Sequence, residues 1–144
     1  MFYFAKNLHD CSLTTADVSW NTSKVTNMDA MFSTLYNLRY DTVDMSEEFF
    51  YKPFDNQFNG NISNWNTSNV TSMKYMFAGA TSFNQKIDTS LVKLSNDISY
   101  NAWDVSKVTD MSDMFSIAIK FNQNISKWDL SSCTNLKSMF EFIK

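Results

Sequence analysis

The sequence predicts an α/β fold, a solenoid of short parallel strands and short helices with one inserted β-hairpin. Three observations lead to this class. One phrase recurs along the chain, its apolar residues have helical spacing, and a shorter motif rich in strand-forming residues follows it. Reactive chemistry needs one constellation of groups, whereas stacked turns need many copies of one packing surface. The repetition therefore indicates a stacked architecture and gives no evidence of a catalytic site.

The recurring phrase defines a unit of about 25 residues. Its clear copies are WNTSKVTNMDAMF at 20–32, WNTSNVTSMKYMF at 65–77, WDVSKVTDMSDMF at 103–115 and WDLSSCTNLKSMF at 128–140. Steps of 25 residues from Trp65 reach Tyr40 and Ser90, which mark degenerate copies of the repeat. Both termini fall inside a unit, so we expect residues 1–144 to form a single solenoid domain that is a segment of a longer array.

Each phrase predicts a short helix that cannot stand alone. In the third copy the apolar residues follow the i, i+3, i+4, i+7 spacing of one helical face: Met111, Met114, Phe115 and Ala118. A threonine precedes each set and is predicted as the helix N-cap; these are Thr26, Thr71, Thr109 and Thr134. Helices of two or three turns are unstable in isolation. We therefore expect equivalent side chains, such as Phe77, Phe115 and Phe140, to line up in one column.

A strand and a hairpin complete the predicted unit. Phe121, Ile125 and Trp128 are the apolar positions of FNQNISKW, a pattern that predicts a short strand entered through a bend. Between Ile87 and Trp103 the repeat phase slips by 13 residues, and two strand-like runs flank Ser95-Asn96-Asp97. We expect residues 87–103 to form an inserted β-hairpin.

Composition narrows the possible functions. The chain has 2 glycines and 1 proline, so we expect its loops to turn on Asn, Asp, Ser and Thr. A net charge of -3 offers no basic stripe, and we expect no nucleic-acid partner. No apolar run approaches the roughly 18 residues of a membrane span, and we do not expect the opening residues MFYFAKNLHD to act as a secretion signal, because no charged segment precedes a long apolar one.

The residues that carry reactive chemistry are few. His9 is the single histidine and is expected on the surface; Cys133 stands in a column of valines and is expected to be a free thiol rather than a partner of Cys11. For Asp110 with Asp113, and for Glu47 with Glu48, we favour a place in the first turn of a helix over the alternative of a calcium or paired-carboxylate site. We expect no catalytic residues, no metal and no cofactor.

Two repeat columns each allow two interpretations. The tryptophans are expected in the core, with an exposed ladder that binds sugars or partners as the alternative. The asparagines after the repeat phenylalanine, Asn59, Asn84 and Asn122, are expected to bond to loop backbone between turns rather than to a ligand.

The combined phrase V-T-x-M-x-x-M-F-x-x-A-x-x-F-N-Q-x-I-x-x-W-D-x-S, read from residues 108–131, resembles the BspA-like leucine-rich-repeat surface proteins. It looks like the branch with repeats of about 25 residues found in mycoplasma and Listeria lipoproteins. The resemblance implies a leucine-rich-repeat-like solenoid on extracellular or wall-associated lipoproteins, with roles in adhesion or host interaction. It implies no catalytic residues.

These observations predict a non-enzymatic cell-surface module for adhesion or host binding, which presents its strand face and the hairpin at 87–103 to a protein or glycan partner. The residues that we expect to contact the partner lie between apolar strand positions: Ser63, Asn64, Asp88, Thr89, Ser126 and Lys127. The alternative is a structural array element that self-associates through open solenoid ends.

Overall fold

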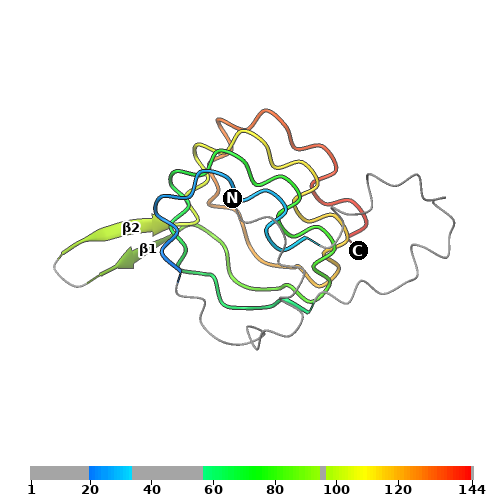
Figure 1. Ribbon diagram of the computed structural model, residues 1–144, viewed down its shortest axis with the longest axis horizontal. Coiled ribbons are helices and arrows are strands. Elements are labelled where there is room, and N and C mark those ends of the chain that lie inside the picture. Colours follow the sequence, from blue (N-terminus) through cyan, green and yellow to red (C-terminus); the bar gives the residue numbers. More distant parts are fainter. Residues whose placement is uncertain (1–19, 34–56, 95–96, 144) are drawn as a thin grey trace, which may run out of the picture.

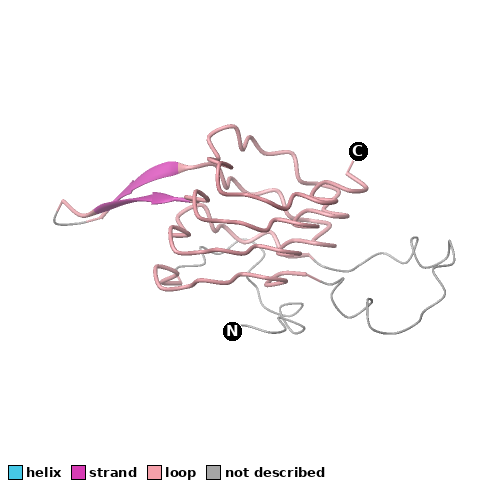
Figure 2. Ribbon diagram, turned by 90° about the horizontal axis from the view of Figure 1, so that it is seen from above, coloured by secondary structure: helices cyan, strands magenta, loops and turns pink. Residues whose placement is uncertain are grey.

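The computed structural model describes residues 20–33, 57–94 and 97–143. These residues wind into a stack of coils, and a two-stranded hairpin projects from one side of it (Figure 1 and Figure 2). We call the segments that carry the recurring phrase the first, second, third and fourth coils; they span residues 20–33, 65–80, 103–118 and 128–143. The return segments, 57–64, 83–89 and 121–127, precede the last three coils.

The expected α/β class is wrong. The described residues contain no helix, and their two strands, β1 (Ser90–Lys93) and β2 (Ser99–Ala102), pair antiparallel within the hairpin. Across the described ranges, parallel pairing between coils is limited to isolated bridges that join Asn27, Ser72, Asp110 and Asn135 in turn. A leucine-rich-repeat-like solenoid with helices and a parallel sheet is therefore not the architecture of this chain.

Successive β-turns replace the expected helices. In the second coil, N–H···O bonds of 3.2, 3.0 and 2.9 Å close the turns 73–76, 75–78 and 77–80. Tyr75 and Gly79 have φ angles of 57° and 74°, the left-handed conformation that a type II turn requires at its third residue. A β-turn and a helical turn both bring residues three apart to one side. The apolar spacing is therefore compatible with either structure.

Hydrogen bonds between coils explain why these segments are not helical. From Met73 to Gly79, the N–H of every second residue donates to a carbonyl of the third coil at 2.8 to 3.0 Å, while the N–H groups of Met76 and Ala78 close turns. The N–H of Lys74 donates instead to Asp29 Oδ1 of the first coil at 2.9 Å. The first coil donates to the second in the same manner, and the third to the fourth. An α-helix would use each interior N–H for its own i to i−4 bond. The bonds between neighbouring coils are available only because no helix forms.

The recurring threonines link coils and do not cap helices. The hydroxyls of Thr71 and Thr109 donate to the carbonyls of Thr26 and Thr71, both at 3.1 Å. Thr134 donates in the same way to the carbonyl of Thr109 at 3.2 Å. The N-cap prediction is wrong, because the helices that would need caps are absent from the described coils.

Asparagine and aspartate side chains form the turns, as the low glycine and proline content predicts. In each coil the residue after the tryptophan accepts, through Oδ1, the N–H two residues further on; these residues are Asn21, Asn66, Asp104 and Asp129. This Asx geometry lets a side chain stand in for a backbone turn. The expectation for the loops is confirmed at these positions.

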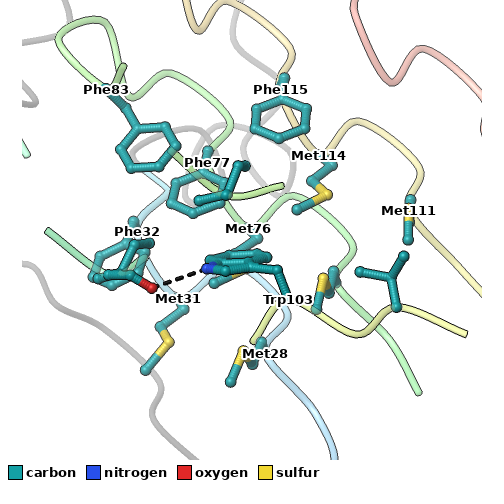
Figure 3. Close-up of a cluster of buried hydrophobic side chains, with 14 of the residues drawn as sticks. Met28, Met31, Phe32, Met76, Phe77, Phe83, Trp103, Met111, Met114 and Phe115 are labelled. Carbon is teal, nitrogen blue, oxygen red and sulfur yellow. Dashed lines mark hydrogen bonds between the residues drawn. The ribbon is translucent and has the colours of Figure 1, made fainter. Parts of the chain in front are cut away.

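Phenylalanine rings form two columns along the stack. The first contains Phe32, Phe77, Phe115 and Phe140, and the second contains Phe58, Phe83 and Phe121. Ring centroids in the first column are 5.5 Å apart at every step, and Figure 3 shows its first three rings beside the methionines of the same coils. The expected alignment of Phe77, Phe115 and Phe140 is confirmed. Each coil supplies a packing surface to the next.

The tryptophans are core residues in three of the four coils. Trp65, Trp103 and Trp128 are buried, and Trp20 in the first coil is exposed. The indole Nε1 of Trp103 donates to the carbonyl of Ile62 at 2.9 Å, the bond drawn in Figure 3, and Trp128 donates to Ile87 at 2.8 Å. The favoured core interpretation is confirmed for these three residues.

We expect Phe77→Ala to be strongly destabilising, because this ring is fully buried and stacks on Phe83 and Phe115. The free energy of unfolding should fall by about 3–5 kcal/mol, measured by urea denaturation. Phe142→Ala is the control: its side chain is 57% exposed, and the loss should stay below about 1 kcal/mol. Equal losses would contradict the assigned column.

Ala30→Gly should stabilise the chain, because Ala30 has a φ of 53° and only glycine adopts this region without a steric penalty. We expect a gain of about 0.5–1 kcal/mol in the free energy of unfolding. Ala78→Gly is the matched control at a position without positive φ, and it should cost at least about 0.5 kcal/mol. A loss at both positions would show that the left-handed turn is absent.

Candidate interaction surface

The six residues predicted to contact a partner lie on one corner of the stack. They follow the isoleucine position of each return segment, Ile62, Ile87 and Ile125. Asp88 Oδ1 accepts the N–H of Lys127 at 3.1 Å, which joins two of these segments. The corner borders the hairpin, because Tyr100 of β2 donates its hydroxyl to the carbonyl of Asn64.

Several polar groups on this corner already hold the chain together. Thr89 Oγ1 donates to the carbonyl of Trp103 at 2.9 Å, and the Asp88 carboxylate is engaged with Lys127 as described. The N–H groups of Ser63 and Ser126 donate to Asn61 and Asn124, at 3.1 and 2.9 Å. The structure brings the six residues together, and partner contact through them stays a prediction.

The hairpin, expected to face the partner, exposes apolar residues that sequence reasoning did not single out. Leu91, Leu94 and Ile98 are 59%, 51% and 59% exposed. Val92 pairs with Tyr100, and the N–H of Leu94 bonds to the carbonyl of Ile98 at 2.8 Å. Positions that alternate along a strand share a face, so Val92, Tyr100, Leu94 and Ile98 form one apolar face. The two strand-like runs around Ser95-Asn96-Asp97 were the available signal, but such runs do not tell a buried strand from an exposed one.

Only part of that apolar face is covered by the stack. Val92 and Tyr100 pack against the hydrophobic core, whereas Leu94 and Ile98 extend beyond it into solvent. Figure 2 shows the hairpin projecting away from the coils. The strands lie within residues 87–103, the segment for which we expected an insertion. The hairpin therefore packs against the core at its base and exposes apolar side chains toward its tip.

The asparagine column bonds to backbone, as expected. Asn59 Oδ1 accepts the N–H of Asn84 at 2.8 Å, and Asn84 Oδ1 accepts the N–H of Asn122 at 2.9 Å. Gln85 and Gln123 reinforce this ladder with side-chain bonds to the same two asparagines. These amide groups therefore serve the junctions between return segments.

Asp110 belongs to the bridge column and not to a helix, so its favoured place in a first helical turn is wrong. Burial raises the pKa of this carboxyl, but hydrogen bonds from Ser112 and Asn135 and the charge of Lys74 outweigh that effect and hold the pKa below its usual value. The bond from Ser112 is made by its N–H at 2.8 Å, since the buried Ser112 hydroxyl has no partner of good geometry among the described residues. Asp113, assigned to the same helical turn, has a φ of 55°.

Metal-ligating groups do not gather in the described ranges. These ranges contain no cluster of three or more His, Cys, Asp or Glu side chains that could hold an ion. Cys133 is a half-buried free thiol, whose Sγ lies 3.6 Å from the carbonyl oxygen of Asn135. His9, Cys11, Glu47 and Glu48 lie outside the described residues. We also find, over residues 20–33, 57–94 and 97–143, no helix of the length and apolarity that crossing a bilayer needs.

Comparison with known proteins identifies a family. The family model described as "Mycoplasma protein of unknown function, DUF285" matches residues 1–89 and again residues 39–141. The chain belongs to this family. The two DUF285 matches overlap, as expected for a chain that repeats one unit. No curated protein and no solved structure matches the chain.

Asp110→Asn should weaken the acid sensitivity of folding. Because the folded-state pKa of Asp110 is lowered, its contribution to stability is present above the unfolded value of about 3.9 and is lost as pH falls through the folded value. The variant should be less stable than the parent near neutral pH and should lose less stability on acidification, measured by urea denaturation. Asn27 and Asn135 occupy the same column, so the geometry tolerates asparagine. Identical pH profiles for the two proteins would contradict this role.

Proposed function

We propose that this chain is a non-enzymatic interaction module of the cell surface that binds a protein partner through the hairpin of β1 and β2. One observation carries the proposal: the hairpin projects from the stack with Leu94 and Ile98 exposed at the end of an otherwise packed apolar face. Exposed apolar patches on soluble proteins commonly mark interaction sites, because leaving them in water is costly.

The polar corner beside the hairpin supplies a rim for such an interface. Asn64, Ser126 and Lys127 are exposed there, next to the base of the hairpin where Tyr100 meets Asn64. Protein interfaces commonly combine an apolar centre with a polar, solvent-accessible rim. This combination favours a protein over a glycan, since three of the four repeat tryptophans are buried and form no exposed aromatic ladder.

The sequence motif of the repeat supports a location on the cell surface. The phrase at residues 108–131 resembles that of the BspA-like surface proteins, and the chain belongs to a family of Mycoplasma proteins. The module is proposed to act in adhesion or host contact outside the cell. Accessibility of the protein to added protease on intact cells tests this location, and complete resistance, with digestion after lysis, would refute it.

The double variant Leu94→Ser/Ile98→Ser tests the hairpin. Fluorescently labelled chain should bind saturably to cultured host cells, and the variant should bind about tenfold more weakly or worse, as expected when central anchors of an interface are lost. Ile119→Ser is the matched control, since Ile119 is 54% exposed but lies outside the hairpin; its binding should be unchanged. Protease treatment of the cells should abolish binding. Equal binding by the double variant, or binding that survives protease, would overturn the proposal.

A further inference from the structure

The strands of the hairpin pair in a register that directs backbone groups outward along both edges. The N–H of Leu94 bonds to the carbonyl of Ile98 at 2.8 Å, which identifies a hydrogen-bonded pair. In an antiparallel ladder such pairs alternate with pairs whose N–H and C=O groups point away from the partner strand. The register gives the pairs of this second kind as Lys93 with Ser99 and Leu91 with Asn101. Each of these four residues therefore presents its backbone N–H and C=O at an outer edge of the hairpin.

The outer edge of β2 is open along most of its length. Ser99 and Asn101 are exposed, and among the described residues their outward N–H and C=O groups make no hydrogen bond. Two residues further along the same edge, the N–H of Trp103 donates to the carbonyl of Trp65 at 3.0 Å. The second coil thus pairs with the inner end of this edge, and the rest of the edge projects with the hairpin beyond the coils (Figure 1).

The strand β2 lacks the features by which edge strands discourage further pairing. Such strands commonly carry a lysine, a proline or a bulge. Lys93 places a positive charge on β1, whereas the four residues of β2 include no charged residue and no proline. The pairing of β2 with β1 is also regular, with one residue opposite one throughout. The edge of β2 is therefore the better template for an additional strand.

The groups along this edge fit the backbone of an extended polypeptide. Ser99 and Asn101 offer donors and acceptors at a spacing of two residues, which is the spacing of a β-ladder. An added strand would place alternate side chains next to Tyr100 and Ile98, on the apolar face, and the others next to the polar residues of β2. A two-stranded hairpin is only marginally stable in water, so a third strand would also support the part that projects from the stack.

We propose that β2 recognises its protein partner by strand addition. An extended segment of the partner, apolar at alternate positions, pairs with the outward backbone groups of Ser99 and Asn101 and continues the apolar face of the hairpin. This inference rests on the proposed function and specifies which part of the partner binds. In this mode of recognition, main-chain hydrogen bonds supply affinity and alternate side chains supply specificity.

Proline substitutions at paired positions test which edge is used. Proline lacks an N–H and is tolerated in a strand where that N–H faces solvent. Ser99→Pro should weaken saturable binding of the labelled full chain to cultured host cells about tenfold or more, because it removes a main-chain bond and obstructs the incoming strand. Lys93→Pro makes the same change on the β1 side of the same residue pair and should bind as the parent does. Parent-level binding by Ser99→Pro, or a loss confined to Lys93→Pro, would overturn the proposal.

Backbone esters decide the case in which both prolines weaken binding. An ester in place of the Ser99 amide removes the N–H and keeps the side chain, and binding should fall about threefold to tenfold, as for the loss of one hydrogen bond. The same replacement at Lys93 should leave binding unchanged. Equal binding by the two ester proteins would overturn strand addition to β2.

The outcomes separate this inference from the proposal on which it rests. If Leu94→Ser/Ile98→Ser loses binding to host cells while Ser99→Pro and the Ser99 ester keep it, strand addition is wrong and the hairpin remains the binding site. No saturable binding of the parent would overturn both. Concentration-dependent self-association that Ser99→Pro abolishes, measured by sedimentation, would also overturn the inference, because the added strand would then come from a second copy.

Discussion

Sharing of backbone hydrogen bonds between neighbouring coils is the constraint on which this structure depends. Alternate N–H groups from Met73 to Gly79 donate to carbonyls of the third coil, and those of Met76 and Ala78 close local turns. Every backbone polar group that is buried needs a partner, so this division satisfies the coil only while its neighbour is present. The coil geometry, the left-handed residues and the ring columns all follow from the need to keep both sets of bonds. No coil can keep its conformation alone.

The sequence correctly predicts which side chains face the core. It does not predict the backbone conformation that carries them, which is a chain of β-turns and not a helix. Met73, Met76 and Phe77 are buried, as their spacing indicates, but this spacing is common to helices and to chains of β-turns. What distinguishes the two is the destination of each N–H, which depends on another coil about 25 residues or more away. Secondary-structure propensity depends on neighbouring residues in the sequence, so it cannot predict a hydrogen bond to another coil. Tyr75 is the clearest case, since nothing in its side chain favours a φ of 57°.

The candidate surfaces were predictable to different degrees for the same reason. Asn59 and Asn84 recur at a fixed place in the unit, so their ladder could be read from the repeat. The exposure of Leu94 and Ile98 could not be read in this way, because a strand-like run predicts a strand whether or not the stack covers it. Phe140 is an equivalent of a core residue, and only its position in the last described coil exposes it.

The paired ends of the insertion have a consequence for how the chain can diversify. Ser90 lies opposite Ala102, so the path leaves the stack and re-enters it at adjacent points, and Thr89 is bonded directly to Trp103. An arm of another length or composition could be exchanged between these points while the scaffold keeps its shape. The stack is thus suited to display foreign sequences, and relatives could differ in what they present without differing in what supports it.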